Sequence, residues 1–365
     1  MKPVIPFNDL KRETVGLRPE LDAAAARVLD RGWYLVGEEL RNFEQAFASY
    51  LGIAHCLGMA NGTDALELAL RCLDVGIDDK VIVAPNAGMY GTIAVSRVGA
   101  EPVFADVDPQ SLCLTPAGVE AAAQAGAKAV IVTHLYGQMA DAKAITATAR
   151  RYGLRVIEDC AQAHGARRDG AIAGTVGDIA CFSFYPTKNL GALGDAGGIA
   201  TGDAKLAERA ATLRQYGWKG KYRVEVPHGR NSRMDEMQAA FLLAKLPHLD
   251  QRNERRRAIW RRYREALGGT LRLVGSDGGD FVAHLCVLCA PDRDGLRQRL
   301  SDAGIATDIH YPIPDHRQPV WGGRFDAVSL PVAERACSEV LSLPCFPEMT
   351  DQEVVQVANV LRKAA

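Results

Sequence analysis

A chain of 365 residues, 48% of them hydrophobic, is long enough to bury a sizeable core and, we expect, to form two domains. Its formal net charge of −1 gives no general attraction to nucleic acid or to an anionic membrane. The chain has no apolar run of membrane length and no leader pattern at Met1 to Asp9, which predicts a soluble, cytoplasmic protein. Nine scattered cysteines, an odd number, suit buried thiols in a reducing compartment.

The first half of the chain alternates between predicted helices and predicted strands. Helical periodicity extends from Leu21 to Tyr50 with a break at Gly32 to Gly37, and Asn61 to Asp64 opens another helix. From there we expect strands at 80–85, 102–107, 127–133 and 154–159, and helices at 90–98, 115–125 and 141–152. The strands are continuous apolar runs, as in strands that are covered on both faces. The pattern predicts an α/β fold whose large domain has a mainly parallel sheet, of a seven-stranded type.

The stretch from Asp178 to Gly198 has the most distinctive composition. Ile179 to Phe184 has the β-branched and aromatic bias of a strand, which Pro186 ends. Lys188 then stands alone before a loop with glycines at 191, 194, 197 and 198. A free lysine has a pKa near 10.4, so nucleophilic work at pH 7 requires desolvation or a covalent bond to an aldehyde. The alternative is a surface lysine in a glycine-rich turn.

The last third of the chain predicts a smaller α+β domain. A helix at 234–246 leads to another at 250–267, whose arginine run we interpret as a solvated face and not as a nucleic-acid site, because Glu254 and Glu265 interrupt it. Further segments follow at 271–274, 281–290 and 305–311, with a helix at 294–303 and two final helices, the second opened by the capping box of Thr350 and Glu353. The predicted division is a large domain at 1–248 and a small domain at 249–365.

Cys286 and Cys289 form the only C-x-x-C sequence. They fall in a predicted strand from His284 to Ala290, where residues three apart point to opposite faces. We therefore expect structural thiols there and neither a zinc nor a redox site. No metal site is expected elsewhere in the chain.

Polar and aromatic residues follow several predicted strands at their carboxyl ends, where ligands of open α/β sheets bind. Tyr90, Asp159 and Lys188 each come after a different strand. Asn61 to Asp64 adds a helix N-terminus that can receive a phosphate, although Thr63 could equally be an ordinary helix cap and Asp159 a turn former. A lysine for an imine, an aspartate for a pyridine nitrogen and a phosphate seat together suit pyridoxal 5′-phosphate.

The sequence resembles the DegT/DnrJ/StrS-type sugar aminotransferases over nearly its whole length. The resemblance rests on segments that occur in the same order: 61–66 (Asn-Gly-Thr-Asp-Ala-Leu), 99–104 (Gly-Ala-Glu-Pro-Val-Phe), 158–165 (Glu-Asp-Cys-Ala-Gln-Ala-His-Gly), 182–188 (Phe-Ser-Phe-Tyr-Pro-Thr-Lys), 231–236 (Asn-Ser-Arg-Met-Asp-Glu), 310–314 (His-Tyr-Pro-Ile-Pro) and 343–347 (Leu-Pro-Cys-Phe-Pro). It implies the fold type I architecture of pyridoxal phosphate enzymes, a homodimer in which each active site is built from both subunits.

By position, the resemblance also implies roles for individual residues. Lys188 would bind the cofactor aldehyde and shuttle protons, Asp159 would pair with the pyridine nitrogen, and Gln162 would contact the ring hydroxyl. The family's ring-stacking aromatic falls at Met89, so we place that role on the next residue, Tyr90.

The remaining implied contacts concern the phosphate and the acceptor. The phosphate would be held by Gly62, Thr63, the backbone at Asp64, Ser183 and, from the other subunit, Asn231. Candidates for the sugar nucleotide are Tyr311, His316 and Tyr185.

The implied reaction is transfer of an amino group from L-glutamate to a keto-sugar nucleotide. Residues 185–195 (Tyr-Pro-Thr-Lys-Asn-Leu-Gly-Ala-Leu-Gly-Asp) look more like enzymes that aminate C3, with a dTDP-3-keto-6-deoxyhexose as the expected acceptor; C4 amination is the alternative. Lys188 argues against the family's dehydratases, which replace it with histidine, whereas relatives that make an aromatic amino acid precursor stay open. Two alternatives belong to other functional classes. A NAD-dependent Rossmann oxidoreductase would need a G-x-G-x-x-G motif, which is missing after the first strand. A silent regulator would not need Lys188 and Asp159.

Overall fold

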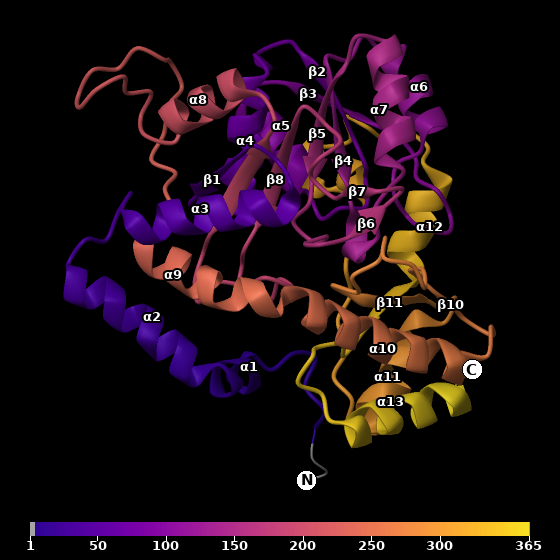
Figure 1. Cartoon of the computed structure of the whole chain (residues 1–365). Coiled ribbons are helices and arrows are strands. Elements are labelled where there is room, and N and C mark those ends of the chain that lie inside the picture. The colour runs from indigo at the N-terminus through magenta and orange to yellow at the C-terminus, as the bar shows by residue number, and fades with distance from the viewer. Residues whose placement is uncertain (1–3, 365) are drawn as a thin grey trace.

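The computed structural model describes residues 4–364 and has a seven-stranded sheet at its centre (Figure 1). The strand order is β1-β9-β8-β5-β4-β2-β3. Strands β2, β3, β4, β5 and β8 pair in parallel, whereas β9 is antiparallel to both of its neighbours, β8 and β1. The predicted α/β fold with a mainly parallel sheet is therefore confirmed. The strands span His55–Met59 (β1), Lys80–Val83 (β2), Glu101–Phe104 (β3), Ala129–Thr133 (β4), Arg155–Asp159 (β5), Ile179–Ser183 (β8) and Gly197–Thr201 (β9).

Two apolar clusters cover the opposite faces of this sheet. In β8, Ile179 and Cys181 pack into one cluster, and Ala180 and Phe182 pack into the other. This alternation follows from the two-residue repeat of a strand, and both sets are apolar because both faces are covered. The first cluster includes residues of α4 (Gly62–Cys72), α5 (Tyr90–Arg97), α6 (Pro116–Ala123), α7 (Ala142–Arg151) and α8 (Ala204–Leu213), and the second includes residues of α3 (Glu38–Leu51) and α9 (Glu236–Lys245).

The helices expected in the first half of the chain are confirmed, with ends that shift by a few residues. The predicted break at Gly32 to Gly37 separates α2 (Arg18–Arg31) from α3. Gly32 has a left-handed backbone with φ of 62° and ends α2 as its C-cap. The N-terminus of α3 is capped by Glu236, whose carboxylate accepts hydrogen bonds from the N–H groups of Gly37, Glu39 and Leu40.

Two of the four loop glycines lie in a strand, contrary to the sequence-based expectation. Gly197 and Gly198 begin β9, which inserts between β8 and β1. The position requires glycine because a Cβ on Gly197 would lie 2.3 Å from the carbonyl carbon and oxygen of Asn61. Strand β9 therefore brings its backbone directly against the segment that begins α4.

The C-terminal part forms the expected smaller α+β unit. Its sheet, in the order β10-β11-β12, is antiparallel. The predicted strand at 281–290 is shorter than expected, and strand β12 was not predicted. Cys286 and Cys289 pack into different apolar clusters, as expected of strand residues three apart. The elements are α10 (Leu249–Leu267), β10 (Arg272–Leu273), β11 (Cys286–Cys289), α11 (Arg293–Asp302), α12 (Pro331–Glu339), β12 (Val340–Leu343) and α13 (Asp351–Ala364).

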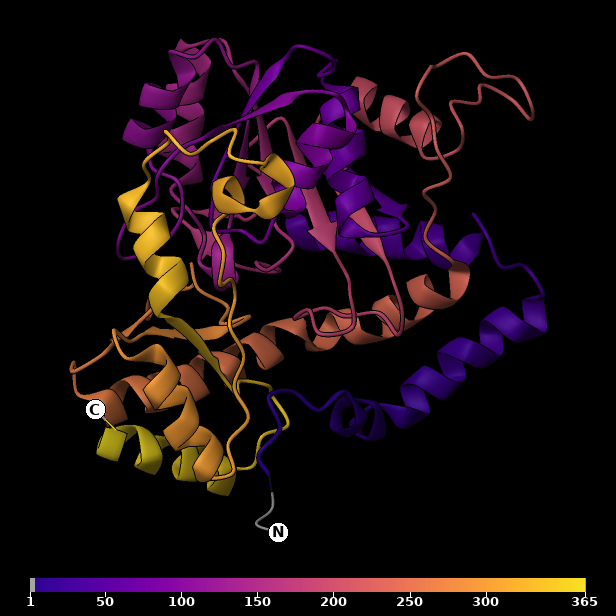
Figure 2. The same ribbon diagram turned by 180° about the vertical axis from the view of Figure 1, so that it is seen from behind.

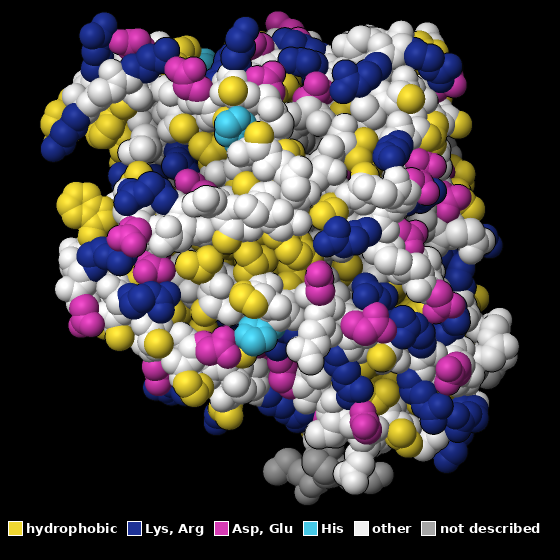
Figure 3. Space-filling model, in the orientation of Figure 1, with side chains coloured by type: hydrophobic (Ala, Val, Ile, Leu, Met, Phe, Trp, Pro, Cys, Tyr) yellow, Lys and Arg dark blue, Asp and Glu magenta, His cyan; other side chains and the backbone are white. Residues whose placement is uncertain are grey.

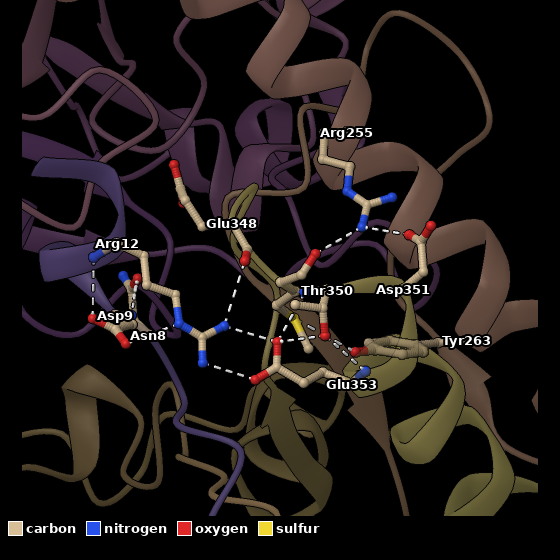
Figure 4. A network of polar contacts seen from close by, with 10 residues as sticks. Asn8, Asp9, Arg12, Arg255, Tyr263, Glu348, Thr350, Asp351 and Glu353 are labelled. Atoms are coloured by element: carbon tan, nitrogen blue, oxygen red, sulfur yellow. Dashed lines mark hydrogen bonds and ion pairs between the residues drawn. The ribbon is translucent and has the colours of Figure 1, made fainter. Parts of the chain in front are cut away.

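The N-terminal segment packs against the C-terminal unit, as seen from behind in Figure 2. Ile5 pairs with Ile305 and belongs to the same apolar cluster as residues of α10 and α13. Arg12, in α1 (Leu10–Gly16), donates two hydrogen bonds of 2.8 Å to the carboxylate of Glu353, which also forms the predicted capping box with Thr350 (Figure 4). The start of the chain thus crosses the predicted boundary between 1–248 and 249–365.

Charges of both signs are interspersed over the face shown in Figure 3, with an apolar strip along the region of α9. This distribution agrees with the near-neutral net charge of the chain. Across residues 4–364, no helix combines the length and apolar character that crossing a membrane requires.

Candidate active site

A cavity of about 720 Å³ lies at the carboxyl edge of the large sheet, between the large sheet and the C-terminal unit. Thr133, Asp159 and Ser183 at the ends of β4, β5 and β8 form part of one wall, and residues of the C-terminal unit form the opposite wall. The edge is where ligands of open α/β sheets bind. Nine of the residues proposed from the sequence line this cavity: Gly62, Thr63, Tyr90, Asp159, Gln162, Ser183, Tyr185, Lys188 and Tyr311.

Lys188 projects into the cavity from a tightly folded loop. The backbone N–H of Lys188 donates a hydrogen bond to the carbonyl of Tyr185 (2.8 Å). The loop folds back so closely that a Cβ on Gly191 would lie 2.4 Å from the carbonyl oxygen of Pro186. Within residues 4–364 the Lys188 amine has no hydrogen-bond or ion-pair partner. Desolvation lowers the pKa of Lys188 to about 8, although the charge of Asp159 acts in the opposite direction. The amine is therefore suited to act as a nucleophile or base near neutral pH.

Asp159 ends β5 between β4 and β8, at the centre of the sheet. It is buried, and each carboxylate oxygen accepts one hydrogen bond, from the Ala161 N–H (3.1 Å) and from the Thr133 hydroxyl (3.3 Å). Burial raises the pKa of Asp159 above its ordinary value, and the Ala161 N–H and the positive charge of Lys188 oppose that rise. Lys188 and Asp159, the pair selected from the sequence, thus line one cavity. A cationic N–H group beside Asp159 would balance the charge of the buried carboxylate.

The N-terminus of α4 opens onto the same cavity. Asn61, and not Thr63, is its cap: the Asn61 Oδ1 accepts a hydrogen bond of 2.8 Å from the Asp64 N–H. Within the described chain the N–H groups of Gly62 and Thr63 have no partner. A Cβ on Gly62 would lie 2.7 Å from the Cβ of Ser183, so glycine brings the helix terminus close to the end of β8. Two free N–H groups at the positive end of a helix form an anion seat.

Aromatic side chains form another part of the wall. Tyr90 is 48% exposed and meets Tyr311 edge to face, with ring centroids 6.2 Å apart. Met89, where the family's stacking aromatic falls, caps α5 with a left-handed backbone and does not line the cavity. The Tyr311 hydroxyl accepts a hydrogen bond from the Gln162 side chain (3.2 Å), whose oxygen accepts from the Tyr136 N–H (2.6 Å). Of these two residues, Tyr90 lines the cavity and Met89 does not.

Three proposed residues lie outside this cavity. The Asp64 carboxylate forms an ion pair with Arg230 (3.0 Å). The backbone N–H of Asp64 donates to the side chain of Asn61, so the group expected to contact the phosphate already has a partner within the protein. His316 is buried; its Nε2 lies 2.9 Å from a Glu334 oxygen, and it therefore does not reach the cavity of its own chain. Asn231 is exposed and does not line the cavity of its own chain.

The cavity also contains residues that the sequence interpretation missed. Arg256, His284 and His310 line it, and Arg256 belongs to the arginine run that was interpreted as a solvated face. A helical signal was available, because the buried residues of α10 recur at helical spacing: Leu249, Asn253, Arg256, Trp260 and Tyr263.

His134, Glu158 and Cys160 form a buried group with ligand-like spacing. The His134 Nδ1 accepts a hydrogen bond from the Ala140 N–H, which leaves the Nε2 to donate to Glu158 at 3.0 Å. Glu158 also accepts hydrogen bonds from the N–H groups of residues 174, 176 and 177. Burial alone would raise the pKa of Glu158, but the hydrogen bonds from His134 and these N–H groups lower it. Hydrogen bonding within the protein thus accounts for His134 and Glu158.

Comparison with known proteins gives full-length relatives. A transaminase of Streptomyces venezuelae, named dTDP-3-amino-3,4,6-trideoxy-alpha-D-glucose transaminase, is 44% identical over 100% of this chain and 97% of its own. The Erythromycin biosynthesis sensory transduction protein EryC1 of Saccharopolyspora erythraea is 44% identical over 99% of this chain and 100% of its own. The crystal structure of S. venezuelae DesV in complex with a ketimine intermediate has a TM-score of 0.95 at 44% identity and covers 100% of this chain and 99% of its own.

A second solved structure, from Bacillus subtilis, is described with bound cofactor PMP. Its TM-score is 0.92 at 31% identity, and the match covers 99% of this chain and 85% of that chain. The family model of the DegT/DnrJ/EryC1/StrS aminotransferases matches residues 17–362. The chain therefore belongs to the DegT/DnrJ/EryC1/StrS aminotransferase family.

Proposed function

We propose that this protein is a pyridoxal 5′-phosphate-dependent aminotransferase that moves an amino group from L-glutamate to C3 of a keto-sugar nucleotide. The observation that carries the proposal is the convergence of Lys188, Asp159 and the N-terminus of α4 on one cavity, in a chain of an aminotransferase family. The amine, the buried carboxylate and the free N–H groups match the aldehyde, the ring nitrogen and the phosphate of this cofactor.

The residues fit the cofactor by their own chemistry. Asp159 is a buried carboxylate with one hydrogen-bond donor on each oxygen, so a protonated pyridine nitrogen would supply a positive charge where a buried anion needs one. Gly62, Thr63 and Ser183 together form a small, electropositive seat for the phosphate. When bound, pyridoxal 5′-phosphate supplies an aldehyde that bonds to amines and a ring that accepts an electron pair.

Lys188 acts as the proton carrier of the transfer. Once the donor amine has displaced it, the neutral Nζ would take the proton from the α-carbon of glutamate, whose C–H electron pair the cofactor would accept, and would deliver that proton to the cofactor's former aldehyde carbon. Asp159 and Tyr90 both line the cavity: Asp159 would keep a proton on the ring nitrogen, and Tyr90 would cover one face of the ring. The same residues then work in the reverse order on the keto-sugar, which gives a ping-pong cycle.

For the acceptor, we propose a dTDP-linked 3-keto-6-deoxyhexose. Support comes from the S. venezuelae relative, which is named for a dTDP-3-amino sugar. Tyr185 and Tyr311 line the cavity and are the residues we assign to sugar contact. Incubation with glutamate and a panel of 3-keto and 4-keto nucleotide sugars, followed by mass spectrometry, tests this acceptor. Preferential amination of a 4-keto sugar would contradict it.

A regulatory role is the second candidate, because the S. erythraea relative is named as a sensory transduction protein. A regulator without turnover needs no base at Lys188 and no carboxylate at Asp159. The presence of both in one cavity favours catalysis.

We also infer a homodimer with shared active sites. Large apolar side chains on three segments are exposed in the single chain: Trp33 at 60%, Tyr34 at 54%, Leu193 at 41%, Tyr222 at 75% and Val224 at 61%. The segment between α8 and α9 projects from the body of the molecule in Figure 1 and ends near the exposed Asn231. Exposed apolar patches of this kind mark protein interfaces. The nine buried free cysteines fit the cytoplasm as its location.

Lys188→Ala tests the proposed chemistry. The variant should lose the spectral change that L-glutamate produces in the cofactor-loaded wild-type protein, because no other amine is assigned to the proton transfer. Absorbance spectra before and after addition of glutamate measure this change. Lys205→Ala, which removes an exposed lysine of α8, is the control and should behave as wild type. Formation of pyridoxamine phosphate by Lys188→Ala would refute the assignment.

A further inference from the structure

The arginine run of α10 contains one member that differs from the rest. Six of its seven arginines form ion pairs: Arg252 with Glu13 and Glu348, Arg255 with Asp351, Arg257 and Arg261 with Glu254, Arg262 with Glu265, and Arg264 with Asp277. Arg256 has no carboxylate partner among residues 4–364. The predicted solvated face describes Arg262 and Arg264, which are about half exposed, but not Arg252 and Arg257, whose side chains are 18% and 17% exposed, and least of all Arg256.

Arg256 is also the buried member of the run, with 5% of its surface exposed. Its Nη1 donates to the carbonyl oxygens of Cys345 (2.5 Å) and His284 (3.4 Å), whereas its Nε and Nη2 have no partner in the described chain. Burial lowers the pKa of Arg256, since neutral carbonyls do not balance its charge. A buried guanidinium that lines a cavity with free donors is prepared to bind an anion.

Arg256 and Lys188 line the same cavity, together with His284. His284 has a pKa lowered by burial and then by the positive charges of both Lys188 and Arg256. Cys345 and His284, whose carbonyls accept the hydrogen bonds of Arg256, line the wall formed by the C-terminal unit, as does Leu343. An anion that reaches Arg256 must enter the cavity completely.

We propose that Arg256 binds a carboxylate of the amino-acid donor. The inference rests on the proposed function, because it assigns the donor site of that reaction. The planar guanidinium presents Nε and Nη2 side by side, which matches the two oxygens of a carboxylate, and the carbonyls of Cys345 and His284 hold it in place. Arg256 would thereby favour an amino acid as the donor over an amine that has no carboxylate.

The test compares Arg256→Gln and Arg256→Lys with Arg255→Gln, which removes a partly exposed ion pair from the adjacent position of α10. The concentration of L-glutamate that half-saturates the spectral change of the holoenzyme should rise about a hundredfold or more in Arg256→Gln. It should rise less in Arg256→Lys, which keeps the charge, and stay at the wild-type value in Arg255→Gln. Unchanged glutamate saturation in Arg256→Gln, or in Arg256→Lys if the glutamine variant does not fold, would overturn the proposal.

A second measurement separates the donor from the acceptor and does not need turnover. Glutarate, an unreactive dicarboxylate, should raise the melting temperature of the wild-type protein and of Arg255→Gln but not that of Arg256→Gln. The reaction of the pyridoxamine-loaded enzyme with the keto-sugar should be retained in Arg256→Gln; its selective loss would assign Arg256 to the diphosphate and contradict the proposal. Failure of wild type to respond to glutamate would instead refute the proposed function itself.

Discussion

At the scale of single residues, the proposed chemistry depends on how a lysine and an aspartate share one cavity. Burial lowers the pKa of Lys188 to about 8 and raises that of Asp159. Each charge opposes the effect of burial on the pKa of the other group. The result is an amine that can lose its proton near neutral pH beside a carboxylate able to hold a cation.

This arrangement predicts the pH dependence of Lys188 in the cofactor-free protein. Only the neutral amine reacts with aldehydes, so the rate of reductive methylation of Lys188, measured by mass spectrometry, should reach half its maximum near pH 8 and not near pH 10. The charge of Asp159 raises the pKa of Lys188, so Asp159→Asn should move this midpoint to lower pH. A midpoint above pH 10 in wild type would show that the amine is not desolvated.

Residues next to predicted strand ends are the ones that the structure brings into one cavity. Lys188, Asp159 and Tyr90 each follow a strand whose pattern is readable, and the carboxyl edge of the sheet brings them together. Arg256 was missed because its role depends on which side of a charged helix is buried. His316 was proposed from a segment whose neighbours line the cavity, but its own side chain turns to Glu334 and Phe104. Such choices depend on packing between elements that are distant in sequence.

At the scale of elements, the phosphate seat depends on the contact between β9 and α4. Gly197 in β9 lies against the carbonyl of Asn61, the cap of α4, and Gly62 lies against Ser183 in β8. The three elements therefore meet closely, with only the small side chain of Ser183 between α4 and β8, and this holds the free N–H groups of α4 at the cavity surface. The glycines fix the position of the helix, and are not simply a flexible loop.

Gly197→Ala should weaken cofactor binding and stability together. The added Cβ would lie 2.3 Å from backbone atoms of Asn61, which cannot move without displacing the start of α4. We expect a loss of roughly 1–3 kcal/mol in the free energy of unfolding and a weaker affinity for pyridoxal 5′-phosphate, measured by denaturation and by absorbance titration. Gly202→Ala, just beyond β9, is the matched control, because its Cβ would meet nothing within 4 Å. Equal behaviour of the two variants would contradict the proposed contact.

The strands missed by sequence analysis share a physical cause. β9 begins with two glycines, which carry no hydrophobic pattern. β1 and β9 pair antiparallel at the edge of the sheet, whereas the sequence analysis predicted a sheet of mainly parallel strands. β12 follows α12 without a connecting loop, so the end of the helix conceals the start of the strand. In each case the strand is specified by its neighbours in the sheet and not by its own periodicity.

At the scale of the whole molecule, the single chain leaves part of the proposed site unfilled. Asn231 is exposed and absent from the cavity of its own chain, and apolar side chains such as Tyr222 and Val224 stand exposed on the same projecting segment. A twofold dimer would pair these surfaces and let each subunit contribute to the other's phosphate seat.

Mixing two inactive variants tests the shared site. Asn231→Asp places a negative charge where the phosphate is proposed to bind, and Lys188→Ala removes the amine, so each homodimer should have little activity. A mixed dimer has one site with both wild-type residues, and random assembly should restore about a quarter of the wild-type activity. Mixing Lys188→Ala with the Lys188→Ala, Asn231→Asp double variant is the control and should restore none. Full activity of Asn231→Asp alone, or no recovery on mixing, would contradict the shared site.

Of all parts of the architecture, the division into domains has the least support from the sequence. Ile5 and Arg12 attach the start of the chain to the C-terminal unit through Ile305 and Glu353, although residues 1–248 were assigned to the large domain. Contacts between the two ends of a chain leave no local pattern, so sequence reading cannot find them. The boundary near α10 stays a prediction.

Among the described residues, Lys188 is the one lysine on the wall of the cavity, and it approaches from the β8 side. A planar carbon that receives hydrogen from a fixed direction acquires a single handedness. The amino sugar should therefore be released as one epimer, and D-glutamate should fail as a donor because its hydrogen would point away from the base. Two epimers in the nuclear magnetic resonance spectrum of the product would mean that solvent, and not this amine, delivers the hydrogen.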